Sequence, residues 1–190
     1  MSDLQARLEA ILRGSPAMTS VLRGARSLGL PDAWIVSGAV YQRVFNHLTG
    51  RDPDYGIKDY DLFYFDGADL SYEAEDRVIR RAAAAFEPPL CDLVEVRNQA
   101  RVHLWFEAKF GEPYTPLGSS AEAVGRFVSP TFAVGVRLEA GDSLSVIAPF
   151  GLDDLFAMRM RPNPARRTMG FERVAANMRS RWPELKVEPA

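Results

Sequence analysis

Two aspartates lie two residues apart at the start of an aromatic-rich, strand-like segment, residues 59–65. Alternate side chains of a strand share a face, so Asp59 and Asp61 are expected to project side by side. Bringing two like charges together is unfavourable, and a divalent cation is the usual compensation. Carboxylate oxygens favour Mg²⁺ or Mn²⁺ over zinc. The pair therefore predicts a metal site, and the alternative is a pair at a sheet end that faces water.

A second pair with the same spacing, Asp52 and Asp54, shows that the spacing alone is not specific. Pro53 separates these two residues, and they lie in a loop, residues 49–58, that is rich in Gly, Asp and Pro. No apolar run flanks them. We therefore interpret this second pair as a solvated turn.

A third carboxylate, Glu95, lies within the otherwise apolar segment of residues 93–96. Glutamate is rare in such a strand unless it has a partner. If this strand pairs with the strand of the two aspartates, the three acids converge and supply the oxygen ligands of two metal ions about 4 Å apart. The alternative for Glu95 is an ion pair with an arginine such as Arg97 or Arg101.

A strand, a turn and a helix are predicted over residues 34–40, with Ser37 and Gly38 at the turn. A glycine at this place lets the backbone approach a ligand, and a helix N-terminus offers free N–H groups to phosphate. The Ser37 hydroxyl adds a further polar group. The alternative is a tight strand-to-helix connection without a ligand.

The composition of the 190 residues is that of one globular domain, with 47% hydrophobic and 25% charged residues. The single cysteine, Cys91, excludes an intramolecular disulfide and zinc sites built on several cysteines. With only His47 and His103, to which we assign no role, histidine-rich metal sites are excluded as well. We see neither a signal peptide nor a membrane-spanning segment, so we expect a cytoplasmic protein without a membrane partner.

The net charge of −2 predicts no strong attraction of the whole chain to nucleic acid. The C-terminal part is nevertheless basic, because eight Arg and Lys residues lie between Arg159 and Lys186, against only two acids. Three interpretations remain open for this segment: a solvated helix face, an anion-binding wall for a nucleotide, and a contact with a polynucleotide.

The elements that must position these residues alternate between helices and strands. An amphipathic helix capped by Ser2 comes first, and Gly141-Asp142 joins the last two strands as a hairpin. This order predicts an α/β (α+β) domain with a mixed sheet flanked by helices. We expect one domain, residues 1–190, with a helical N-terminal extension (1–29) and a helical basic C-terminal segment (151–190). The further helices are predicted over residues 15–28, 39–48, 71–86, 98–110, from 119, 151–160 and 165–181, and the strands over 33–36, 59–65, 90–96, 132–138 and 143–148.

The turn and the acidic strand together resemble the polymerase-β-like nucleotidyltransferase superfamily. Its short signature is a hydrophobic residue, Gly and Gly or Ser, followed by an acid–hydrophobic–acid strand, here residues 36–39 and 59–61. Two positions depart from the family pattern. Ala39 replaces the second Gly or Ser, and Gln42 followed by Arg43 stands where the tRNA-tailing branch has an arginine, which argues against tRNA-end synthesis.

A longer likeness points to a group of short bacterial nucleotidyltransferase-like proteins and runs from about residue 30 to residue 182. It is carried by residues 57–66, 94–105 and 148–156.

The resemblance implies a polymerase-β-like fold and a two-metal mechanism. Asp59 and Asp61 would hold both Mg²⁺ (or Mn²⁺) ions, one of them on an NTP. Glu95 would bind the second ion and orient or deprotonate the acceptor hydroxyl, and in-line attack would expel pyrophosphate. Ser37 and the Gly38 backbone would cradle the triphosphate.

Four further residues are candidate nucleotide contacts. Lys58 and Arg43 are candidate phosphate cations, and each is otherwise a solvated surface charge. Asn98 and Arg101 share a helix face and are candidates for contact with nucleotide or acceptor, with a helix cap and an ion pair as the alternative. The aromatic residues that follow, of residues 105–110, are interpreted as core.

We therefore expect a metal-dependent nucleotidyltransferase that moves an NMP group from an NTP to an acceptor that the sequence does not identify: a small molecule, a protein or an RNA. The alternative is a catalytically weak or inactive nucleotide-binding or interaction module of the same fold. A metal-dependent phosphohydrolase that uses the same carboxylates ranks last.

Overall fold

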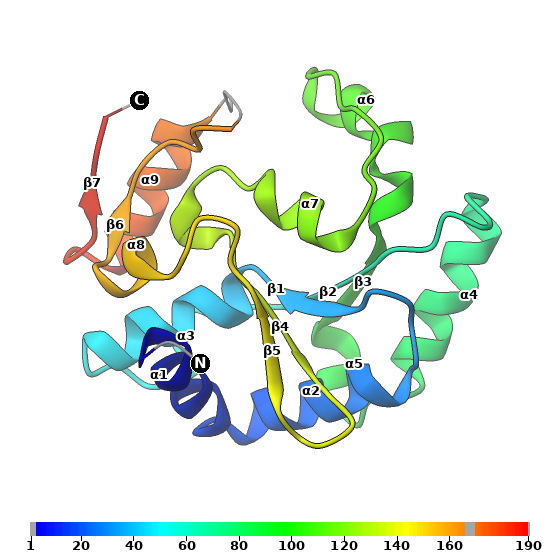
Figure 1. The fold of residues 1–190 in the computed structure, drawn as a ribbon, viewed down its shortest axis with the longest axis horizontal. Coiled ribbons are helices and arrows are strands. Elements are labelled where there is room, and N and C mark those ends of the chain that lie inside the picture. Colours follow the sequence, from blue (N-terminus) through cyan, green and yellow to red (C-terminus); the bar gives the residue numbers. More distant parts are fainter. Residues whose placement is uncertain (1–2, 166–169, 190) are drawn as a thin grey trace.

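A five-stranded mixed sheet forms the centre of the computed structural model, which describes residues 3–165 and 170–189 (Figure 1). The strand order is β3-β2-β1-β4-β5. Strands β2 and β3 pair in parallel, and the other neighbours pair antiparallel. The predicted mixed sheet is confirmed. The strands are β1 (Trp34–Val36), β2 (Tyr60–Tyr64), β3 (Val94–Asn98), β4 (Gly135–Leu138) and β5 (Leu144–Ile147).

Strand β2 divides its side chains between the two faces of the sheet. Tyr60, Leu62 and Tyr64 are buried in the main core, whereas Asp61 and Phe63 alternate with them and are only partly buried. This alternation sends the predicted catalytic aspartate to the face opposite the main core.

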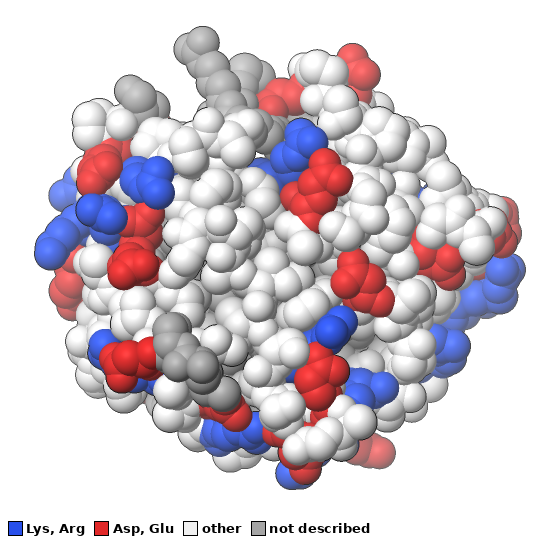
Figure 2. Space-filling model, viewed as in Figure 1, with Lys and Arg blue, Asp and Glu red and all other residues white. Residues whose placement is uncertain are grey.

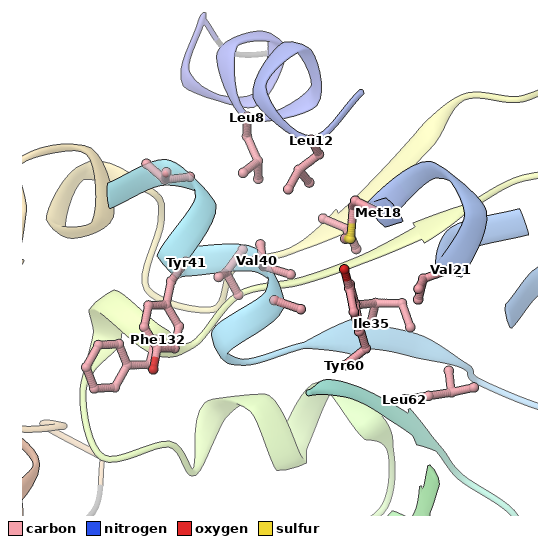
Figure 3. Packing of buried hydrophobic residues seen from close by; sticks show 14 of the residues in the cluster. Leu8, Leu12, Met18, Val21, Ile35, Val40, Tyr41, Tyr60, Leu62 and Phe132 are labelled. Carbon is pink, nitrogen blue, oxygen red and sulfur yellow. The ribbon is translucent and has the colours of Figure 1, made fainter. Parts of the chain in front are cut away.

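The main core lies between the sheet and the helices from the first half of the chain. Leu8 and Leu12 of α1 point toward α3, close to Met18 of α2 (Figure 3). A second, smaller cluster packs Val36 of β1 against Val124 of α7. The helices named here are α1 (Asp3–Arg13), α2 (Pro16–Ser27), α3 (Gly38–Leu48), α4 (Tyr72–Ala83) and α7 (Ser120–Gly125).

Serine caps fix the beginnings of two predicted helices. The Ser15 hydroxyl accepts a hydrogen bond from the Met18 N–H at 3.2 Å, and the Ser71 hydroxyl accepts one from the Ala74 N–H at 3.2 Å. The predicted starts of α2 and α4 are therefore confirmed. The predicted Ser2 cap, and residues 166–169 of the last predicted helix, lie outside the described residues.

Several predicted boundaries are wrong because pairing and capping override the local pattern. Leu90–Leu93 form a short helix, α5, and β3 begins only where Val94 finds its partner Tyr60 on β2. Residues 98–110 do not form one α-helix but a 3₁₀ helix (Gln99–Leu104) followed by α6 (Phe106–Phe110). Residues 130–132 are also a 3₁₀ helix, so the fourth strand starts later than predicted.

The C-terminal part contains a small parallel sheet that the sequence pattern did not predict. Residues 151–160 form a one-turn helix, α8 (Asp153–Phe156), and then β6 (Arg159–Met160), which pairs with β7 (Lys186–Val187). The two strands are far apart in the chain, so a local sequence pattern cannot predict that they pair. Helix α9 (Phe171–Arg181) lies between them in the sequence.

The aromatic residues around α6 are not part of the core, contrary to the prediction. The Phe106 ring lies 4.7 Å from the Phe110 ring and 4.3 Å from the Tyr114 ring, between centroids, and Phe110 is 50% exposed. Helix α6 projects away from the sheet (Figure 1), so its rings pack on one another instead. Among the described residues, no helix is long and apolar enough to span a membrane.

Candidate active site

The turn between β1 and α3 holds Ser37 in an unusual backbone conformation. Its φ of 64° and ψ of −142° lie in a region that non-glycine residues rarely adopt, and such strain clusters at functional sites. The Ser37 side chain forms a hydrogen bond with Asp61. At the next position, a Cβ on Gly38 would lie 2.6 Å from the Gln42 amide nitrogen. A side chain at this position would therefore displace the end of the Gln42 side chain, which folds back over the first turn of α3.

Strand register brings two of the three predicted acids together. Asp61 of β2 and Glu95 of β3 are direct partners in a parallel pair, so their side chains leave the same face of the sheet. Asp59 lies two residues before Asp61, immediately before β2 begins. The expected pairing of the two acid-bearing strands is therefore confirmed.

The pKa values of the aspartates show that the three charges affect one another. Burial raises the pKa of Asp61 to about 6, and the charges of Asp59 and Glu95 add to this effect, while the hydrogen bond from Ser37 and the charge of Arg97 oppose it. Burial also raises the pKa of Asp59, followed by the charge of Glu95, against the opposing charge of Lys58. The site thus concentrates negative charge that its own cations do not fully compensate.

Glu95 also forms the alternative interaction expected from the sequence, an ion pair with Arg97. Its carboxylate is 53% exposed and lies 3.6 Å from the Arg97 guanidinium. Within residues 3–165 and 170–189, no group of three or more His, Cys, Asp or Glu side chains is gathered closely enough to hold a metal ion. The carboxylate donors fit a hard cation in chemistry and in excess negative charge, while Glu95 is paired with Arg97.

A cleft of about 320 Å³ opens beside the two aspartates. Five predicted site residues line it: Ser37, Gly38, Lys58, Asp59 and Asp61. Five more, which the sequence reasoning missed as site residues, complete the wall: Tyr41, Gln42, Gly56, Asn177 and Arg181.

Arg43 is placed away from this cleft. Its side chain is 1% exposed, donates to the Ala39 carbonyl at 2.6 Å and to the Tyr60 hydroxyl at 2.9 Å, and pairs with Asp54 at 2.5 Å. It lines a separate, larger cavity of about 460 Å³, together with His47. The structure therefore does not bring Arg43 to the acids. The turn that carries Asp54 is exposed, as interpreted from the sequence, with this ion pair in addition.

Asn98 and Arg101 form a helix cap and an ion pair, which was the alternative to contact with a ligand. The Asn98 side chain accepts a hydrogen bond from the Ala100 N–H at 3.1 Å and so caps the 3₁₀ helix. Arg101 pairs with Glu75 of α4. Both side chains are buried and neither lines the cleft beside the aspartates.

The cations of the basic C-terminal segment have different environments in its described part, where Arg173, Arg179 and Lys186 are exposed to solvent. Arg159 and Arg161 both bind the buried Asp154, at 2.6 and 2.7 Å, and so serve the fold. Arg181 instead lines the cleft. On the face that Figure 2 shows, basic and acidic side chains are interspersed around a largely uncharged centre. Arg166 and Arg167 lie outside the described residues.

Comparison with known proteins connects this geometry to a chemistry. A family model described as nucleotidyltransferase matches residues 23–187. A solved structure described as revealing "a CCA-adding enzyme head domain" is 26% identical and has a TM-score of 0.77, with 98% of this chain and 96% of that chain covered. No curated protein matches the chain. The structural match spans nearly the whole chain and confirms the fold expected from the sequence.

Proposed function

The chain belongs to the nucleotidyltransferase family, and from that premise we propose that it transfers an NMP group from an NTP to an acceptor hydroxyl and releases pyrophosphate. The observation that carries the proposal is the register partnership of Asp61 and Glu95, with Asp59 beside them. Asp59 and Asp61 line a cleft that also contains the N-terminus of α3, and Glu95 lies outside that lining. A cluster of carboxylates next to a phosphate-binding backbone suits phosphoryl chemistry.

Asp59 and Asp61 are proposed to hold Mg²⁺ (or Mn²⁺), with Glu95 as a further ligand once it leaves Arg97. The raised pKa values of the two aspartates support this, because a bound cation would favour the ionised forms that burial and the neighbouring acids disfavour. When bound, the metal neutralises charge on the transferring phosphoryl group and on the leaving group.

The residues of the chain bind and orient the reactants. The Gly38 N–H is proposed to donate to a phosphate oxygen, and the Ser37 hydroxyl is proposed to do so once it leaves Asp61, while Lys58 adds a positive charge at the same cleft. The acceptor oxygen attacks the α-phosphorus and forms the new P–O bond, while the bond from that phosphorus to the bridging oxygen breaks and pyrophosphate leaves. Glu95, which is exposed beside the cleft aspartates, takes the proton of the acceptor hydroxyl.

The test measures pyrophosphate release and transfer of label from each of the four NTPs, with Mg²⁺ or Mn²⁺ and cell extract as the source of acceptor. We expect activity in the wild type and a loss of about 100-fold or more in Asp61→Asn, a loss typical of removing one group that stabilises transition-state charge. Asp92→Asn is the matched control, because Asp92 is exposed on α5 and does not line the cleft. Equal activity in Asp61→Asn and wild type would contradict the proposal.

A binding module without turnover is the second candidate. It is favoured by the ion pair between Glu95 and Arg97, which occupies the acid that the reaction needs. This candidate predicts that wild type and Asp61→Asn both bind NTP while neither releases pyrophosphate. Release of inorganic phosphate without pyrophosphate would instead indicate a phosphohydrolase.

A further inference from the structure

The end of α9 is anchored to α3, and this anchor places Arg181 at the cleft. Trp182, the next residue, is fully buried, and its indole N–H donates to the Asn46 side chain at 3.0 Å. Its ring also meets the Phe45 ring edge-on, with centroids 5.7 Å apart. Because Trp182 is fixed on α3, the side chain of Arg181 lies against the wall that α3 and the loop before β2 form.

Arg181 has only neutral partners in the described part of the chain. Its guanidinium donates to the Gly56 carbonyl at 3.3 Å and to the Asn177 side chain at 3.2 Å, both long for a charged donor, and it lies over the Trp182 ring at 4.7 Å. Its buried Nε has no hydrogen-bond partner. Arg43 and Arg101, by contrast, each pair with a carboxylate.

A second unpartnered buried atom belongs to the same wall. The Gln42 side-chain oxygen is buried without a hydrogen-bond partner. Gly56, with a φ of 74°, lies between the two groups, since a Cβ there would be 3.4 Å from both the Gln42 oxygen and an Arg181 nitrogen. Polar atoms left buried in this way are costly unless a ligand or water completes their bonding.

The cleft therefore has an acidic wall and a basic wall. The pKa of the Tyr41 hydroxyl is raised mainly by burial, and it is affected in opposite senses by Arg181 and by the two aspartates, so all three charges act on the same part of the cleft. Arginine binds phosphate oxygens through two parallel N–H groups, whereas carboxylates repel them. A ligand that carries a polyphosphate together with a divalent cation matches both walls.

We propose that Arg181 is the cation that binds the polyphosphate of the nucleotide, in the cleft that Asp59 and Asp61 also line, with Asn177 and Gln42 as supporting amides. The identity of the ligand rests on the proposed function. The assignment gives the C-terminal helix α9 a part in substrate binding, and it leaves the exposed side of β3, with Glu95, for the acceptor.

The test measures binding of ATP, ADP, AMP and adenosine to the full chain by calorimetry in the presence of Mg²⁺. We expect Arg181→Gln to weaken ATP binding by about 10- to 100-fold, as for loss of hydrogen bonds to a charged group, with a smaller effect on AMP and none on adenosine. Arg181→Lys keeps the charge but not the paired donors, so it should recover affinity in part. Arg179→Gln is the matched control, because Arg179 is exposed on the same helix turn and does not line the cleft.

The proposal fails if Arg181→Gln binds ATP as the wild type does, if adenosine loses as much affinity as ATP, or if the wild type binds no nucleotide. Asn177→Ala provides a variant at an exposed position that should still fold and should weaken ATP binding several-fold. Pyrophosphate release tests the proposed function separately. If the wild type releases pyrophosphate but Arg181→Gln binds ATP unchanged, only the role of Arg181 is contradicted. If Arg181→Gln selectively loses ATP binding but the wild type shows no turnover, only the transferase function is contradicted.

Discussion

Asp61 shows at the scale of one residue what the site does to its acids. It is partly buried next to two other carboxylates, and its pKa rises to about 6 because burial and like charges both disfavour ionisation. Arg43 faces a comparable desolvation but pairs directly with Asp54. The site therefore leaves its own negative charge incompletely compensated, in contrast to the structural ion pairs elsewhere in the fold.

Stability should depend on pH through Asp61 when metal is chelated. The pKa of Asp61 is raised from 3.8 to about 6 in the folded state, so between these values the folded state binds more protons than the unfolded state. The free energy of unfolding then falls as pH rises from about 4 to 6, and it levels off above that range. Asp61→Asn removes this effect, so in EDTA at pH 7.5 urea unfolding should show it to be more stable than the wild type, by at most about 3 kcal/mol.

Two comparisons sharpen this prediction. The advantage of Asp61→Asn should disappear below about pH 4, and Mg²⁺ should stabilise the wild type but not the variant if Asp61 is a ligand. Asp92→Asn should follow the wild type at every pH. An Asp61→Asn protein that is less stable than the wild type at pH 7.5 in EDTA would contradict the electrostatic account.

At the scale of elements, the sequence predicted the turn and the strand that carry the family signature, and it predicted that the strands bearing the acids pair with each other. Alternation and helix-start signals are local, so β2, α3 and the starts of α2 and α4 followed from the pattern. The position of Arg181 did not, because it depends on the contact between Trp182 and Asn46, two residues far apart in the chain.

The residues after Glu95 show why the rest of the site was not predictable. The sequence placed Asn98 and Arg101 on one α-helical face, but the chain there forms a 3₁₀ helix, and Arg101 turns to Glu75 of α4. Glu75, the partner of Arg101, lies on another helix, so a local sequence pattern cannot predict this ion pair. Arg43 is a similar case, since its partner Asp54 lies in a loop that the pattern identifies only as solvated.

The anchoring of α9 can be tested at Trp182. Trp182→Phe keeps an aromatic side chain but removes the indole N–H that donates to the Asn46 side chain. Leaving that buried acceptor unpaired should lower the free energy of unfolding by about 1–3 kcal/mol. The same change should weaken ATP binding, because it loosens the position of Arg181. Urea unfolding and calorimetry measure the two effects.

Phe110→Ala is the control for this prediction. Phe110 is half exposed in the aromatic cluster around α6 and does not belong to the main core. Its removal should change stability by less than about 1 kcal/mol, the range typical of surface positions, and should leave ATP binding unchanged. If Trp182→Phe behaved like Phe110→Ala in both measurements, α9 would not be held to the cleft through this contact.

Over the whole molecule, the net charge of −2 is the small difference between 23 basic and 25 acidic side chains. In the described part of the basic C-terminal segment, Arg159 and Arg161 are bound to Asp154 and Arg181 faces the cleft. Its other described cations, Arg173, Arg179 and Lys186, are exposed to solvent. Basic and acidic side chains are interspersed on the face that Figure 2 shows. Electrostatic attraction along a polynucleotide requires several cations on one surface.

We therefore expect weak, non-specific binding to single-stranded RNA and tighter binding to ATP, because one nucleotide fills the cleft whereas a long strand gains little from a chain of net negative charge. Non-specific complexes of nucleic-acid-binding proteins have Kd values of about 10⁻⁴–10⁻⁶ M at physiological salt. Fluorescence anisotropy of a labelled 20-nucleotide RNA should accordingly show half-saturation only above about 1 µM protein. Sub-micromolar binding that weakens steeply with salt would contradict this expectation, since it would require a basic surface large enough to displace several counterions. If binding stays weak, an RNA acceptor would have to be recognised by contacts at the exposed side of β3, beside Glu95, and not by the overall charge of the protein.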